Sequence, residues 1–160
     1  MDQAQTSYAG FWMRFLAYII DAILLGVVSF LVFLPLLGVI GLTSSGHLSD
    51  MRDNSSFENG MMAALIATYM FSILVVAAAG WLYFALMESS AKQATLGKLA
   101  LGLRVTDMNG NRITFGRATG RYFGKLVSGL ILYIGFIMAG FTQQKQALHD
   151  IMAGTLVLKK

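Results

Sequence analysis

A chain of 160 residues that is 56% hydrophobic and only 12% charged departs from the composition of soluble domains, in which about 25% of residues are charged. The composition therefore indicates an integral membrane protein. The absence of cysteine excludes disulfides and thiolate metal ligands. We attribute the net charge of +4 to Lys and Arg in cytoplasmic loops, and no pattern points to nucleic-acid binding.

The first apolar segment covers residues 11–42 and is longer than the roughly 20 residues that a bilayer requires. Two registers are therefore possible. A span over residues 22–42 places Asp21 at the headgroup boundary, whereas a span over residues 11–34 places it inside the hydrocarbon layer. Pro35, with glycines soon after it, is typical of a helix end, and this favours the second register.

The second apolar segment, residues 61–87, contains no charge, and the chain that follows it is strongly basic. By the positive-inside rule, this basic module, residues 88–122, lies in the cytoplasm. The polar, turn-rich loop over residues 43–60 then lies outside, and the amino terminus lies in the cytoplasm.

The third apolar segment, residues 123–141, either crosses the membrane or forms a bent, re-entrant element. A full crossing would put the lysines of the tail, residues 142–160, outside, against the charge rule. The glycines of this segment fit a bend, and non-helical backbone is tolerated at membrane depth where protein or water covers it. We expect the bent form, a cell-membrane location, both termini in the cytoplasm, and one domain over residues 1–160.

A small β-hairpin is expected inside the basic module. Apolar residues alternate over 102–107 and over 112–115, on either side of the pair Asn109-Gly110, which is a strong signal for a tight hairpin turn. Because an isolated hairpin is only marginally stable, we expect a further strand near residues 155–158. The predicted fold class is an all-α integral membrane protein with two transmembrane helices, a third bent segment and a small cytoplasmic β-hairpin.

Three blocks of the chain resemble one known family of membrane proteins. The blocks are "RFLAYIIDAILL", "ATLGKLALGLRVTDMNGNRITFGRATGR" and "QALHDIMAGTLVL", and they occur in the expected order. They are similar to the RDD family, which is named for one arginine and two aspartates that map here onto Arg14, Asp21 and Asp150. The resemblance implies a role connected with ligand transport or with sodium/proton exchange, without choosing between them.

The charges in and near the apolar segments predict a functional cluster. An ionisable residue inside a membrane helix costs about 2.5–3.5 kcal/mol, so it usually has a partner. Arg14 and Asp21 share one helical face about 10 Å apart, and Asp150 can approach Arg14 if both termini lie inside. We predict a cluster of Arg14, Asp21 and Asp150 with Glu88 and His149 nearby. The alternative is a buried charge network that only fixes helix packing.

Basic residues at four-residue spacing form one edge of a predicted helix. Arg117, Arg121 and Lys125, together with Lys98, are expected to bind lipid headgroups, with a phosphorylated ligand as the alternative. The histidines, His47 and His149, are assigned to opposite sides of the membrane, so we expect no metal site and no cofactor.

Two functions fit these observations. The first is cation/proton exchange, with Asp21 as the exchanging carboxylate, Arg14 as the tuning charge and Asp150 as the cytoplasmic gate partner. Because three apolar segments do not enclose a pathway alone, exchange would require a homo-oligomer, with Na⁺ or protons as the ligands. The second is a non-transporting adaptor or assembly factor that binds membrane lipids or partner proteins. No arrangement of nucleophile and base is visible, so we do not expect an enzyme.

Overall fold

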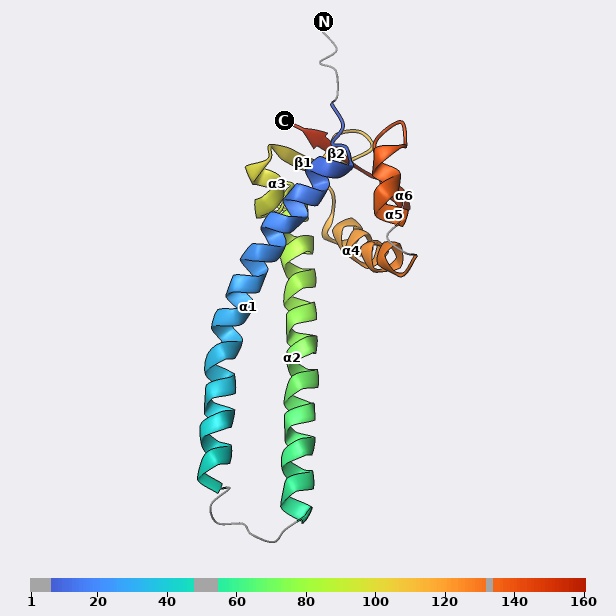
Figure 1. Cartoon of the computed structure of the whole chain (residues 1–160). Coiled ribbons are helices and arrows are strands. Elements are labelled where there is room, and N and C mark those ends of the chain that lie inside the picture. The colour runs from blue at the N-terminus through green and yellow to red at the C-terminus, as the bar shows by residue number, and fades with distance from the viewer. Residues whose placement is uncertain (1–6, 48–54, 132–133) are drawn as a thin grey trace, which may run out of the picture. The chain divides into compact units, whose positions relative to one another are not determined.

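The computed structural model of the chain describes residues 7–47, 55–131 and 134–160. It divides into two compact units. One unit, called here the sheet unit, combines Met1–Ile23 with Gly80–Lys160, and the other, the helix unit, is Leu24–Ala79. Figure 1 follows the chain through both.

Two long helices cross from one unit into the other along the chain. Helix α1 runs over Phe11–His47 and α2 over Ser55–Ser89. Parts of both are long and apolar enough to span a membrane, Phe11–Leu31 with 21 residues and Met62–Ser89 with 28 residues. A helix suits such segments because it satisfies every backbone hydrogen bond internally where lipid offers none. The two predicted membrane helices are confirmed.

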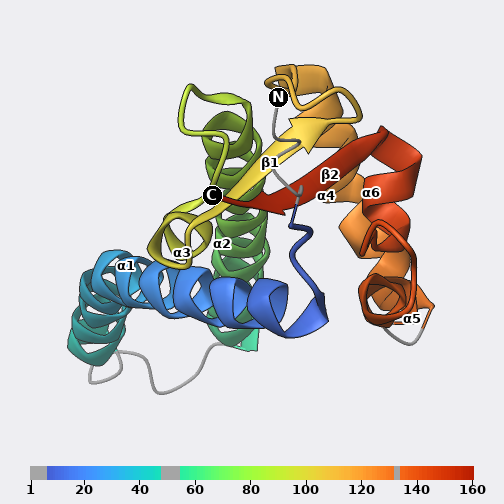
Figure 2. The same ribbon diagram turned by 90° about the horizontal axis from the view of Figure 1, so that it is seen from above.

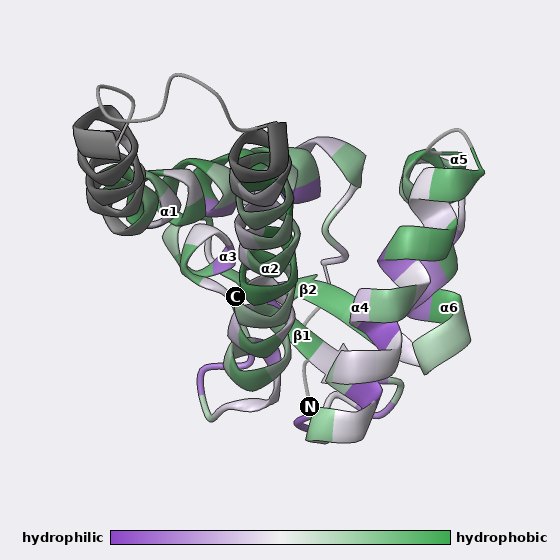
Figure 3. Ribbon diagram, turned by 90° about the horizontal axis from the view of Figure 1, so that it is seen from below, coloured by the Kyte–Doolittle hydropathy of each residue, from purple (hydrophilic) through white to green (hydrophobic). Residues whose placement is uncertain are grey.

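Apolar side chains on the described turns of these helices face outward. Phe30 and Leu74, for example, are exposed by 62% and 67%, and Figure 3 shows hydrophobic colour along much of α2. Helix α1 also continues past Pro35 to His47, so the expected helix end at Pro35 is wrong. Proline removes one backbone hydrogen bond, but leaving the helix in apolar surroundings would lose several.

The sheet unit is built around two antiparallel strands. Strand β1 is Leu103–Asp107 and β2 is Thr155–Lys159, with Val105 opposite Val157. Figure 2 shows the two strands side by side. Chain segments cover both outer edges, because Ala9 N–H donates to the Val157 carbonyl at 2.9 Å and the Val105 N–H donates to Gln93 at 2.6 Å. Covered edges leave no template for pairing with another chain.

The strand pairing differs from the predicted hairpin in one respect. The expected strand near 155–158 is present, but it pairs directly with β1, and residues 111–114 form no strand. The Asp107 carboxylate accepts hydrogen bonds from the backbone of Asn109 and Asn111 and so turns the chain. Thr114 then caps the next helix, which takes the chain away from the sheet.

That next helix begins the bent third segment. Helix α4 is Phe115–Leu130, and it is followed by α5 (Ile134–Ile137) and the 3₁₀ turn η1 (Met138–Gly140), with a bend of 117°. The predicted bent segment is confirmed. A short helix, α6 (Leu148–Ala153), returns to α4, and α3 (Leu96–Ala100) precedes β1.

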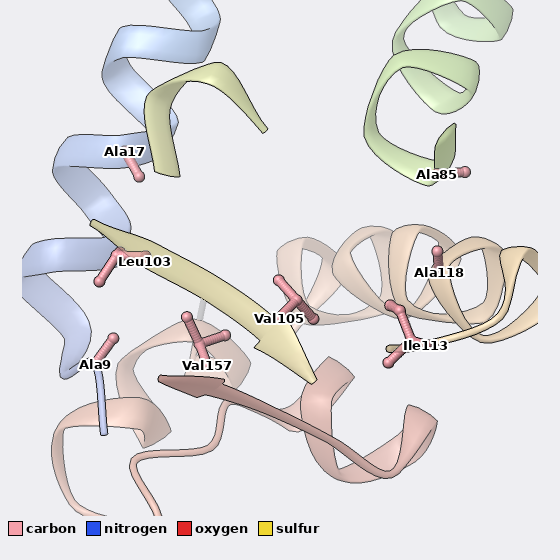
Figure 4. Packing of buried hydrophobic residues seen from close by; sticks show 8 residues of the cluster. All are labelled: Ala9, Ala17, Ala85, Leu103, Val105, Ile113, Ala118 and Val157. Carbon is pink, nitrogen blue, oxygen red and sulfur yellow. The ribbon is translucent and has the colours of Figure 1, made fainter. Parts of the chain in front are cut away.

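Small and β-branched residues form the core of the sheet unit. Val105 and Val157 of the strands are fully buried, as are Ala9 and Ala17 from the start of the chain. Figure 4 shows these side chains together with Ile113 and Ala118. Alanine at the helix contacts lets the backbones approach closely, which brings the polar side chains of neighbouring elements within reach of one another.

Candidate functional site

Asp150, near the start of α6, is a fully buried carboxylate with several basic neighbours. The Arg14 guanidinium pairs with its Oδ2, and Arg121 Nη2 lies 2.6 Å from its Oδ1. His149 Nε2 lies 3.5 Å from the same Oδ1, and the Ala147 N–H donates to Oδ2 at 3.1 Å. Asp150 therefore joins α6 to α1 and α4.

Glu88, near the end of α2, is the second buried carboxylate. Lys98 of α3 pairs with its Oε1, Arg121 Nη1 lies 3.1 Å from its Oε2, and Lys125 Nζ lies 3.6 Å from its Oε1. Arg121 therefore contacts both carboxylates, with a side chain that is only 2% exposed. We call the six residues the charge network: Arg14, Glu88, Lys98, Arg121, Lys125 and Asp150.

Burial and pairing act in opposite directions on the charges of the network. Burial alone would raise the pKa of Asp150, but Arg121 and Arg14 together hold that pKa well below its usual range. Burial lowers the pKa of Lys98 to about 7, and Glu88 opposes this shift only in part. Asp150 therefore stays ionised, whereas Lys98 gains and loses its proton near pH 7.

His149 is neutral in this environment. Burial lowers its pKa to about 3 despite the neighbouring Asp150. The centroid of the ring lies 5.2 Å from that of Phe136, and its buried Nδ1 has no hydrogen-bond partner among the described residues. Gly124 allows α4 to lie close to α6 at His149, because a Cβ at position 124 would lie only 3.0 Å from His149 Cβ. In the described ranges, no group of three metal-ligating side chains occurs.

Asp21 lies in a different set of contacts from the one predicted. Its carboxylate accepts hydrogen bonds from the Tyr83 hydroxyl at 2.8 Å, the Thr95 hydroxyl at 2.6 Å and the Gly97 N–H at 2.7 Å. It is 1% exposed, and no basic side chain in the described part of the chain forms an ion pair with it. The prediction that Asp21 shares one cluster with Arg14 and Asp150 needs this correction.

Helix geometry explains the separation. Seven residues along a helix amount to about 10 Å, which is more than a direct contact between Arg14 and Asp21 allows. Helix α3 instead supplies neutral donors to Asp21. Gly97 is required for this, because a Cβ at that position would collide with the carbonyl oxygen of Ala17. The sequence block "ATLGKL" contained Thr95 and Gly97, but no residue pattern linked them to Asp21.

The four basic residues assigned to lipid headgroups do not form one exposed stripe. Arg121 and Lys98 are buried in the charge network, and Lys125 is 21% exposed at its edge. Arg117 is exposed and lies 3.9 Å from Asp107. The four-residue spacing places Arg117, Arg121 and Lys125 on one edge of α4. Part of that edge is buried, because Arg121 pairs with the buried carboxylate of Glu88.

The fold and the site define a small helical membrane protein in which a buried network of ion pairs ties several elements into one unit. The chain belongs to the RDD family, whose model matches residues 8–154. This confirms the resemblance given by the three sequence blocks. The matched region includes Arg14, Asp21 and Asp150, the residues that the resemblance maps onto the family's arginine and two aspartates.

Two relatives from Bacillus subtilis (strain 168) are similar over nearly the whole chain. The uncharacterized protein YxaI is 38% identical over 152 residues, covering 95% of this chain and 97% of the relative. The uncharacterized membrane protein YteJ is 30% identical over 158 residues, covering 95% of this chain and 81% of the relative. No solved structure gives a significant match.

Proposed function

We propose that the protein is a non-transporting membrane adaptor or assembly factor, whose sheet unit is a fixed basic platform for an anionic partner. The observation that supports this proposal is that each of the two carboxylates of the charge network is already contacted by three nitrogen-bearing side chains. Glu88 is contacted by Lys98, Arg121 and Lys125, and Asp150 by Arg14, Arg121 and His149. The proposal includes no enzymatic activity.

Carboxylates that are already paired with several basic side chains are poor carriers of cations. A carrier must release its counter-charge in order to accept Na⁺ or a proton, and each arginine here is held by more than one partner. Arg14 also donates to the carbonyl oxygens of Ala9 at 2.8 Å and Lys145 at 2.6 Å. Removing one partner of such a buried pair costs about 3–5 kcal/mol, so the network is suited to holding elements together.

Reconstitution into vesicles tests the proposal. Purified full-length protein in proteoliposomes is given a Na⁺ gradient, and the internal pH is followed with a dye. The adaptor proposal predicts the same pH trace as protein-free vesicles at every Na⁺ concentration. A Na⁺-driven pH change in the protein-containing vesicles alone would overturn it.

Cation/proton exchange at Asp21 is the second candidate, favoured by one specific observation. Asp21 is a buried carboxylate held by neutral donors, with no ion pair among the described residues. A carboxylate of this kind can change its protonation without displacing an arginine. This candidate would require a homo-oligomer to enclose a pathway. It predicts that Asp21→Asn, which keeps the side-chain size, abolishes a Na⁺-driven pH change in vesicles containing folded protein.

A further inference from the structure

The charge network contains more positive than negative charge. Four of its side chains are basic, Arg14, Lys98, Arg121 and Lys125, against the two carboxylates of Glu88 and Asp150, which leaves a formal difference of 4 − 2 = +2. Uncompensated buried charge is costly. Burial is the main cause of the lowered pKa of Lys98, about 7, and the neighbouring charges of Arg121 and Lys125 lower it further.

Lys125 has the most exposed basic side chain of the charge network. It is 21% exposed, against 11% for Arg14, 9% for Lys98 and 2% for Arg121. Its Nζ lies 4.3 Å from the centroid of the Phe84 ring and 3.6 Å from Glu88 Oε1. Lys125 shares that oxygen of Glu88 with Lys98, so neither ammonium has a carboxylate oxygen to itself.

The helices that carry Lys125 and its partner Glu88 also bear exposed apolar side chains. On α4, Phe123 and Leu126 are exposed by 51% and 54%, and on the end of α2, Leu82 and Leu86 are exposed by 41% and 55%. These residues belong to the same unit as the charge network. Helices that carry a lysine together with exposed apolar side chains are typical of a membrane interface, where the available anion is the phosphate of a lipid headgroup.

We infer that Lys125, backed by Lys98 and Arg121, forms a binding site for a phosphate group at the exposed edge of the charge network. This inference rests on the proposed function and names its anionic ligand. The phosphate would supply the missing negative charge and accept charge-assisted hydrogen bonds from Lys125. Arg117, on the same helix, is outside the site, because its guanidinium is directed to Asp107.

The test measures how each probe raises the unfolding midpoint of the full-length protein in neutral detergent, since a ligand of the folded state stabilises it by mass action. The probes are short-chain phosphatidylglycerol, diacylglycerol of the same chain length, and inorganic phosphate. We expect saturable stabilisation by phosphatidylglycerol and none by diacylglycerol. Saturation by inorganic phosphate at similar concentrations would identify free phosphate as a ligand, and its absence would identify the lipid as the source.

Two variants on one helix locate the site. Lys125→Gln should weaken phosphatidylglycerol binding by about tenfold, the loss of one hydrogen bond to a charged group. Arg117→Gln, which removes an equal charge two turns away, should bind as wild type does. An equal loss of phosphatidylglycerol binding in both variants would mean that the lipid responds only to general surface charge, and this would overturn the proposed site.

If Lys125→Gln does not fold, the wild-type protein alone still tests whether a phosphate group binds. Equal stabilisation by phosphatidylglycerol and diacylglycerol, with none by inorganic phosphate, would overturn phosphate binding. If that happens while vesicles show no Na⁺-driven pH change, the adaptor proposal stands and only its ligand is wrong.

Discussion

Arg121 connects the two buried carboxylates of the charge network. Its guanidinium contacts Asp150 at 2.6 Å on one side and Glu88 at 3.1 Å on the other, so it joins α4 to both α6 and α2. Arginine suits this position because its planar fork donates in two directions at once and stays charged when buried. The sequence predicted a basic helical edge here, but spacing alone did not reveal that the edge faces two carboxylates.

Loss of Glu88 should destabilise the protein strongly. Glu88→Gln preserves the side-chain size but leaves Lys98, Arg121 and Lys125 without one of their carboxylates, so we expect a loss of about 3–5 kcal/mol in the free energy of unfolding. Unfolding in mixed detergent micelles measures it. Lys92→Gln removes an exposed charge of the same unit and should stay within about 0.5 kcal/mol of wild type. Similar stability of the two variants would contradict the network.

Acidification should weaken the fold through His149. The pKa of this imidazole is about 3 in the folded protein against 6.5 when unperturbed. Between these pH values the unfolded chain binds a proton that the folded chain does not. The free energy of unfolding therefore falls by about 1.4 kcal/mol for each unit of decreasing pH in that window. His149→Gln should show a shallower dependence on pH, and an unchanged slope would refute this assignment.

At the scale of elements, the contact of α4 with α6 relies on one glycine. A Cβ at Gly124 would lie 3.0 Å from His149 Cβ, whereas one at Gly120 meets nothing within 4 Å. The same substitution on the same helix should therefore have opposite effects.

Gly124→Ala should destabilise the protein by about 1–3 kcal/mol through overpacking. Gly120→Ala should stabilise it by about 0.5–1 kcal/mol, because alanine loses less conformational freedom in a helix. Thermal unfolding of both variants in the same detergent measures the difference. Stabilisation by Gly124→Ala would mean that α6 does not lie against α4 as described.

The elements show where sequence reasoning succeeds and where it stops. Alternation and the Asn109-Gly110 pair predicted β1 correctly, because these are local signals. They wrongly assigned residues 112–115 as its direct partner, and the strand expected near 155–158 takes that place instead. Its pairing with β1 depends on contacts between distant parts of the chain, which no local pattern encodes. Asp21 was misplaced for the same reason: its donors, Thr95 and Gly97, come from an element distant in the chain.

For the whole molecule, composition and the long apolar segments were sufficient to predict the two membrane helices. Long apolar segments specify helices because lipid leaves the backbone no other partner, and the family match over residues 8–154 agrees with that reading. The sequence predicted that Arg14 lies close to Asp150, with Glu88 nearby, as the structure has them. Including Lys98, Arg121 and Lys125 in the charge network required the structure, because its members are separated by as many as 136 residues along the chain.

The orientation in the membrane is a prediction of the charge distribution. The chain has no cysteine, so single-cysteine variants can be labelled without background. Gln3→Cys and Lys160→Cys should react with an impermeant maleimide in inverted vesicles only, and Ser55→Cys in right-side-out vesicles only. Labelling of Lys160→Cys from outside alone would contradict a cytoplasmic carboxyl terminus.

If buried ion pairs hold the sheet unit together, Arg14 and Asp150 must be energetically coupled, and a double-mutant cycle measures that coupling. Arg14→Gln, Asp150→Asn and the double variant are unfolded under one condition, with Arg117 and Asp107 as the exposed control pair. We expect the double variant to lose less stability than the sum of the two single losses, by about 1–3 kcal/mol, and the coupling of the control pair to stay below about 0.5 kcal/mol. Additive losses for Arg14 and Asp150 would contradict this expectation.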